Sequence, residues 1–307
     1  MKITKNKSIY VIFGIVCLYI VIVLYSDVDK ISEHFMKANI LFLLLVLPIE
    51  ISAFFVRSIR QKVLLDAIGV NISFMSNLKI FIAGLSMTIT PGGSGGIIKS
   101  HFLKKNFNYS TSKTLPLVFV ERFHDFLAVN TIIIFSLFFF YLWQSFVLVL
   151  MSSIFLIIIF SLMRKKKILR IFLIKMKNIK FISKLIPSLE FSDSLVLLNT
   201  SKTTGKAWII SVFSWLIEIF SAYLIFRSFG IDLHIIEVGQ IVYTSILIGA
   251  LSFIPAGIGF TEGSIITLMM AKGYELSVVS GMVLMLRILT IWFATAIGFI
   301  FTQKFLK

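Results

Sequence analysis

Cysteine is almost absent from this sequence. Cys17 is the only one in 307 residues, which excludes a disulfide framework or a cysteine metal site within the chain. The sequence also lacks a nucleophile elbow, an H-E-x-x-H pair and a G-K-[ST] phosphate loop. We therefore expect no metal, no cofactor and no catalytic residue, and we do not expect an enzyme. The spacing of the histidines is not that of metal ligands either: His34, His101, His124 and His234.

Acidic residues are scarce, with 14 Asp and Glu against 30 Lys and Arg, so the formal net charge is +16. Such a surplus suits either nucleic acid or a membrane surface. Eleven of the basic residues fall in one connector, residues 164–206, between apolar runs. Basic residues beside a membrane helix signal a cytoplasmic side, and they also attract anionic lipid headgroups. We keep both interpretations of the connector and expect no nucleic-acid binding.

Long apolar runs dominate the rest of the chain, in which 58% of residues are hydrophobic. A helix needs about 20 apolar residues to cross a bilayer. Six runs are long enough, and two shorter ones lead into glycine-rich motifs; these are 9–26, 38–56, 115–142, 144–163, 207–226 and 276–301, and then 78–91 and 238–255. The first run has the basic flank of a signal peptide but no small-residue cleavage site, so we expect a retained span. The pattern predicts an all-α multi-pass protein of a prokaryotic cell membrane.

The basic residues also predict a topology. With a cytoplasmic N-terminus, segment 57–79 is cytoplasmic after two spans, and its arginines satisfy the positive-inside rule. The connector is cytoplasmic only if 78–103 enters the membrane and returns. A second such hairpin at 238–272 brings the C-terminus to the cytoplasm. We therefore predict six full spans plus two re-entrant hairpins, or eight or more helices. They form one membrane domain with four parts: the N-terminal span and loop (1–37), the first repeat (38–142), a span with the basic connector (143–206) and the second repeat (207–307).

Two glycine motifs mark these hairpins, PGGSGGIIK at 91–99 and PAGIGFTE at 255–262. Glycine tolerates the positive φ of a sharp reversal, and a loop at the membrane surface is the alternative. The motifs belong to a longer repeat in which Glu, Arg, P-x-G-x-G, Tyr and Arg recur in order. Since the topology turns the second copy over, we predict inverted repeats, as in many transporters. The hinge residues are Pro91, Gly93, Gly95, Pro255, Gly257 and Gly259.

Charged residues interrupt the apolar runs, and each is costly inside a membrane. One interpretation is a buried ion-pair network that locks helix to helix. The other is a polar path in which Arg122 and Arg287 hold an anionic headgroup, because arginine binds phosphate oxygens in pairs. Arg122 and Asp125 are three residues apart and can pair. The candidate path residues are Arg122, Arg287, Glu121, Asp125, Glu262, Glu50, Glu218 and Lys99.

Three segments, TPGGSGGIIKSHFLKK, VFVERFHDFLAV and FIPAGIGFTEGSIITLMM, resemble the lysylphosphatidylglycerol synthase transmembrane, or flippase-like, family. In its large members the membrane region precedes a soluble domain that transfers lysine to phosphatidylglycerol, and the membrane region moves the product outward. The chain ends at Lys307 without such a domain, so the resemblance implies lipid handling without the transferase. The first motif also departs from the family, with Gly96 where an acidic residue is usual.

These features predict the flipping of an anionic lipid, phosphatidylglycerol-like or polyprenyl-phosphate-linked, between leaflets. An alternative is a membrane subunit that presents lipid to a separate glycosyltransferase or aminoacyl-transferase. A secondary transporter of a small anion is a third possibility. The sequence leaves a homo-oligomer open.

Overall fold

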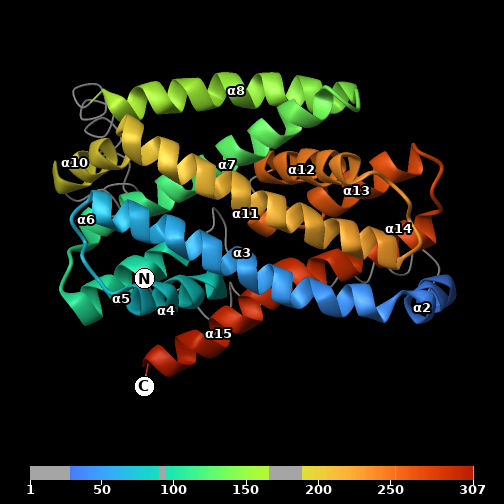
Figure 1. Cartoon of the computed structure of the whole chain (residues 1–307), viewed down its shortest axis with the longest axis horizontal. Coiled ribbons are helices and arrows are strands. Elements are labelled where there is room, and N and C mark those ends of the chain that lie inside the picture. The colour runs from blue at the N-terminus through green and yellow to red at the C-terminus, as the bar shows by residue number, and fades with distance from the viewer. Residues whose placement is uncertain (1–27, 90–94, 166–188, 253, 307) are drawn as a thin grey trace.

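The structure is a computed structural model that describes residues 28–89, 95–165, 189–252 and 254–306. Within these ranges the chain is all-helical, without strands (Figure 1). The elements are α2 Val28–Lys37, α3 Ile40–Ala67, α4 Phe74–Gly84, η1 Leu85–Met87, α5 Gly95–Phe107, α6 Thr111–Thr114, α7 Pro116–Leu137, α8 Trp143–Arg164, α10 Leu189–Leu198, α11 Ser201–Ser228, α12 Ile235–Leu251, η4 Pro255–Gly257, α13 Phe260–Met270, α14 Leu276–Arg287, the π-helix η5 Ile288–Trp292 and α15 Phe293–Leu306.

Four helical segments of the described chain are long and apolar enough to cross a membrane: α3, α8, α11 and the continuous stretch Leu276–Gln303. They match four of the predicted spans. The predicted span at 115–142 coincides with α7, whose charged residues keep it out of this set, so its crossing stays a prediction. The predicted span at 9–26 lies outside the described residues.

The two longest helices, α3 and α11, lie side by side and run antiparallel (Figure 1). The backbone N–H of Asn39, before α3, donates to the carbonyl of Ser228, at the end of α11, over 2.9 Å. Towards the other end of α3, Arg60 donates to Ser211 in the first half of α11 over 2.7 Å. As the numbers rise along α3, they fall along its partner. Side-chain caps begin both helices, from Asn39 and Thr200 respectively.

The order of elements is similar in the two halves of the chain. In the first half, α3 is followed by the short α4–η1, a glycine-rich segment, α5 and the longer α7. In the second half, α11 is followed by the short α12, a glycine-rich segment, α13 and the stretch α14–α15. The halves also meet closely, because a Cβ at Gly298 of α15 would come within 2.1 Å of the Ser86 nitrogen in η1. Only glycine permits this approach of helix backbone to backbone.

The second glycine motif interrupts the helix as a sharp reversal requires. The helix α12 ends at Leu251, and α13 begins at Phe260 and packs back against α12. Gly257 and Gly259 have φ of 64° and 89°, and Ala256, which directly precedes Gly257, has φ of 54°. These left-handed values are easy for glycine and strained for alanine. In the first motif, Gly95 begins α5, whereas Pro91 and Gly93 lie outside the described residues.

One boundary differs from the prediction. Helix α3 does not stop near residue 56 but continues to Ala67, so Arg57 and Arg60 lie within the helix rather than in a connecting segment after it. Arg60 is 1% exposed. The helix keeps these arginines inside the protein because carboxylates on the neighbouring helices α7 and α11 pair with them.

Candidate functional site

A buried charged contact joins α3 to α7 and α11. Arg60 Nη1 lies 2.5 Å from Asp125 Oδ1 on α7 and 2.7 Å from the hydroxyl of Ser211 on α11. The same carboxylate oxygen accepts a hydrogen bond from the indole N–H of Trp215 over 3.3 Å. The other oxygen lies 3.4 Å from Arg122 Nη1, as the three-residue spacing predicts. Asp125 thus collects donors from three helices.

Arg57 lies one turn before Arg60 and has a different environment. Its Nη1 lies 2.7 Å from Glu218 Oε1 on α11, and the guanidinium sits over the Trp215 ring, 4.7 Å from its centroid. Its Nε and Nη2 are buried and have no hydrogen-bond partner among the residues that the structure describes. These two nitrogens form the edge of the guanidinium that binds two oxygens of a phosphate or carboxylate side by side. One edge of the Arg57 guanidinium therefore has the geometry to bind an anion and no partner among the described residues.

Glu50 lies two turns before Arg57 on α3 and is 1% exposed. Its Oε1 is buried without a hydrogen-bond partner. On α12, Tyr243 packs edge-on against Trp215 at 5.2 Å and donates its hydroxyl to the Trp215 carbonyl, which fixes this side of the site. We call the group the central polar cluster: Glu50, Arg57, Arg60, Arg122, Asp125, Trp215 and Glu218.

A separate buried ion pair joins α5 to α7. Lys99 Nζ lies 2.8 and 3.1 Å from the two oxygens of Glu121, and it also lies 4.7 Å from the centroid of Phe81. Both charged side chains are almost fully buried. Lys99 follows the first glycine motif, so this pair fixes the helix after that motif to the next long helix. For these two residues the locking interpretation accounts for the contacts.

The second half of the chain contains an ion pair with the charges exchanged, because here the acidic residue belongs to the helix after the glycine motif and the basic residue to the next helix. Arg287 on α14 donates from Nε to Glu262 Oε1 on α13 over 2.7 Å, and from Nη2 to the carbonyl of Ala256 over 3.3 Å. Glu262 Oε2 accepts the backbone N–H of Gly259 over 2.7 Å, which caps α13. The Nε–Nη2 edge of Arg287 is therefore occupied by contacts that hold the glycine break in place. In each half, a charge after the glycine motif pairs with the next helix.

The structure places Arg122 and Arg287 in separate groups. The Arg122 side chain is 51% exposed at the rim of the central polar cluster, and Arg287 is buried beside the glycine break. Four residues of this region were not among those predicted for the site from the sequence: Arg57, Arg60, Trp215 and Tyr243. A signal for two of them was present, because Glu50, Arg57 and Arg60 recur at helical spacing on one face of α3.

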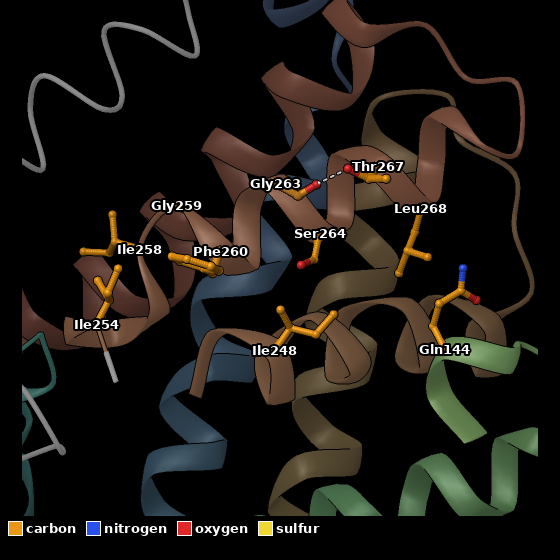
Figure 2. A pocket seen from close by; sticks show the side chains of 10 residues that line it. All are labelled: Gln144, Ile248, Ile254, Ile258, Gly259, Phe260, Gly263, Ser264, Thr267 and Leu268. Atoms are coloured by element: carbon orange, nitrogen blue, oxygen red, sulfur yellow. Dashed lines mark hydrogen bonds between the residues drawn. The ribbon is translucent and has the colours of Figure 1, made fainter. Parts of the chain in front are cut away.

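An apolar groove of about 540 Å³ lies against the second glycine break. Figure 2 shows its lining side chains, which come from α12, α13, the break and the start of α8. Ile254 and Phe260 at the break are well exposed, so the groove is open. Thr267 turns its hydroxyl back to the carbonyl of Gly263, 2.7 Å away, which leaves few free polar groups in the lining. One of them is Gln144, whose buried Oε1 has no hydrogen-bond partner.

Comparison with known proteins places this sequence in a family. The family model described as "Lysylphosphatidylglycerol synthase TM region" matches residues 10–298. A UPF0104 membrane protein, PH1989, of Pyrococcus horikoshii is 26% identical, and the match covers 97% of each chain. UPF0104 membrane proteins of Methanothermobacter thermautotrophicus and Methanocaldococcus jannaschii are 23% and 24% identical over 96% and 98% of this chain and 94% and 95% of theirs. The chain is a membrane protein that belongs to the lysylphosphatidylglycerol synthase transmembrane-region family.

Proposed function

We propose that this protein moves an anionic lipid headgroup between the leaflets of a cell membrane, with Arg57 in the central polar cluster as the group that receives the phosphate. The observation that carries the proposal is the unpaired, buried Nε–Nη2 edge of Arg57. A phosphodiester offers two oxygens to such an edge. Ionisable groups within membrane helices are costly and commonly mark a pathway.

The surroundings of Arg57 support transient binding. Glu218 holds its Nη1, and the Trp215 ring covers one face, so the guanidinium is oriented before a ligand arrives. Arg60 is the weaker candidate: its Nε is also buried without a partner among the described residues, but its side chain is only 2% exposed and Asp125 and Ser211 hold its Nη1. The side chain of Arg57 is 16% exposed while its Nε and Nη2 are buried, so a headgroup reaches that edge once neighbouring side chains move.

The architecture supports movement across the membrane. The similar element order of the two halves and the antiparallel α3 and α11 are what inverted repeats would produce, and they support that arrangement. In such transporters, substrate sites lie where the repeats meet, and Arg57 and Glu218 meet across that boundary. We further propose that the α4–α5 and α12–α13 pairs are re-entrant, with both chain termini in the cytoplasm. The groove beside α13 would then accommodate part of an acyl chain.

A transport assay tests this proposal. The purified protein is reconstituted in vesicles with a fluorescent phosphatidylglycerol, and an impermeant quencher reports how much probe remains in the inner leaflet. We expect wild-type vesicles to exchange the probe much faster than empty vesicles. Arg57→Ala should abolish the difference, and Arg57→Lys should retain only part of it, because lysine lacks the paired edge.

Arg227→Ala is the matched control. Arg227 is also on a long helix and paired with a carboxylate, Asp232, but that carboxylate is well exposed and the pair lies at the end of α11. The control should exchange the probe at the wild-type rate. No exchange above empty vesicles with any of several anionic lipids would contradict the proposal.

The family description favours one alternative, because it names the transmembrane region of a synthase. In that case the protein would bind lipid at Arg57 and present it to a separate aminoacyl-transferase or glycosyltransferase. Lipid that co-purifies with wild type and is lost in Arg57→Ala, combined with no transport in vesicles, would support this alternative.

A further inference from the structure

Glu50 is a buried carboxylate that the proposed transport does not use. It is 1% exposed, and its Oε1 has no hydrogen-bond partner in the described part of the chain. An ionised carboxylate can accept about four hydrogen bonds. Moving it out of water without them has a large free-energy cost. Ser221 lies across from it on α11, within reach of one hydrogen bond to the carboxyl group, which is far fewer than a carboxylate can accept. The pocket around Glu50 thus suits a neutral acid better than an anion.

The charged neighbours of Glu50 point the same way. Arg57 is on its own helix, and Glu218 is on the facing helix α11. Since Arg57 already pairs with Glu218 at 2.7 Å, two carboxylates share one guanidinium. Two other helices contribute titratable groups near this pair. They are Tyr243 on α12 and Asp125 on α7, and Asp125 is already paired with Arg60. The π-helix η5 also packs on α3, and its residues, Ile288–Trp292, carry no charge.

The formal charge of the central polar cluster depends on this one carboxyl group. Three guanidiniums, those of Arg57, Arg60 and Arg122, face three carboxylates, those of Asp125, Glu218 and Glu50. With all six ionised the cluster is neutral and has no excess charge for an anion. With a proton on Glu50 the cluster is +1, which matches the single negative charge of a phosphodiester.

We propose that Glu50 is a proton-binding site whose occupancy is coupled to anion binding at Arg57. Glu50 takes a proton from water as the phosphodiester binds, and it returns the proton to water as the phosphodiester leaves. Coupling between two sites is reciprocal, so the proton strengthens anion binding by the same factor by which the anion strengthens proton binding. Anion affinity therefore falls as pH rises, and a pH difference across the membrane drives lipid movement. The coupling rests on the proposed function, whereas the proton site can be tested alone.

Infrared difference spectroscopy of the purified protein, without added lipid, tests the proton site. The stretch of a protonated, buried carboxyl group is resolved from that of carboxylates, and it shifts in heavy water. We expect a band that disappears as pH rises in wild type and is missing in Glu50→Gln. Glu33→Gln is the matched control, because the Glu33 carboxylate is exposed and paired with Lys37. A band that persists in Glu50→Gln would overturn the proton site.

Calorimetric binding at several pH values tests the coupling. The probes are a short-chain phosphatidylglycerol, its headgroup glycerophosphoglycerol, and inorganic phosphate, which separates a lipid from a free phosphate. For wild type we expect the Kd of the lipid probe to rise by up to about tenfold per pH unit, the limit for one linked proton. Glu50→Gln, which resembles the protonated acid, should bind tightly with a flat profile.

A wild-type pH slope retained in Glu50→Gln would overturn the coupling. Binding of none of the three probes by wild type would instead overturn the anion site at Arg57 and, with it, the coupling. The infrared band would still decide the proton site, so the two failures are distinguishable. Tight binding of inorganic phosphate with no preference for the lipid probe would overturn lipid as the source of the phosphate.

Discussion

Arg60 and Asp125 are 65 residues apart in the chain, yet Arg60 Nη1 lies 2.5 Å from Asp125 Oδ1 with both side chains largely buried. This contact ties α3 to α7 in the middle of the helix assembly. The Asp125 carboxylate also accepts a hydrogen bond from the Trp215 indole and lies against Arg122. It therefore holds the rim of the central polar cluster in place. The pair therefore supports the site by joining helices, and its hydrogen bonds from Arg60 are both made by Nη1.

Removing either partner of this pair should destabilise the protein strongly. Arg60→Ala or Asp125→Ala leaves an uncompensated buried charge, which costs about 3–5 kcal/mol. We expect a clear drop in melting temperature in detergent for each single variant. The double variant Arg60→Met/Asp125→Leu should be less destabilised than the sum of the two. Arg227→Ala, at an exposed pair, should cost about 1 kcal/mol or less. Strictly additive losses in the double variant would argue against a direct interaction.

Much of the fold follows from local sequence, because apolar runs and glycine motifs act locally. The runs at 144–163, 207–226 and 276–301 correspond to α8, α11 and α14–α15 within a few residues. The end of α3 could not be predicted from local sequence, because Arg57 and Arg60 resemble the basic flank of a span until their acidic partners are known. Their partners, Glu218 and Asp125, are more than 60 residues away.

The site was predicted by residue type better than by pairing. Glu50, Asp125 and Glu218 were selected as charges within apolar runs, and they lie in one cluster with Arg57. Arg287 and Glu262 were selected as well, and their contact caps a glycine break. Helical periodicity indicates which residues share a face, but it does not indicate which face of another helix that face meets. Arg122 therefore could not be distinguished from Arg57 by sequence.

A glycine substitution tests the close packing at the second break. A Cβ at Gly249 of α12 would lie 2.0 Å from Thr261 Oγ1 and 3.2 Å from Gly257 Cα. Thr261 can rotate, but the backbone at Gly257 cannot easily move. Gly249→Ala should therefore cost about 1–3 kcal/mol, as overpacking does, and lower the melting temperature.

Gly205→Ala is the matched control, because Gly205 is also within a long helix and a Cβ there meets nothing within 4 Å. It should stabilise the protein by up to about 1 kcal/mol. In the double variant Gly249→Ala/Thr261→Ala, part of the loss should return, since the nearest obstacle is removed. Equal melting temperatures for Gly249→Ala and Gly205→Ala would show that α12 and the break are not in close contact.

Cysteine labelling tests the proposed topology. Ser228, at the end of α11, is 4% exposed and its carbonyl accepts from Asn39, so a label is better placed at Asp232, whose side chain is 83% exposed. In a Cys17→Ser background, an impermeant maleimide added to intact cells should label Asp232→Cys and not Lys104→Cys. The reason is the basic cluster around Lys104, Lys105 and Lys113, which the positive-inside rule places in the cytoplasm. Both variants should label fully once the membrane is dissolved, which shows that each thiol is accessible. Labelling of Lys104→Cys alone in intact cells would turn the topology over and place the loop after α11 in the cytoplasm.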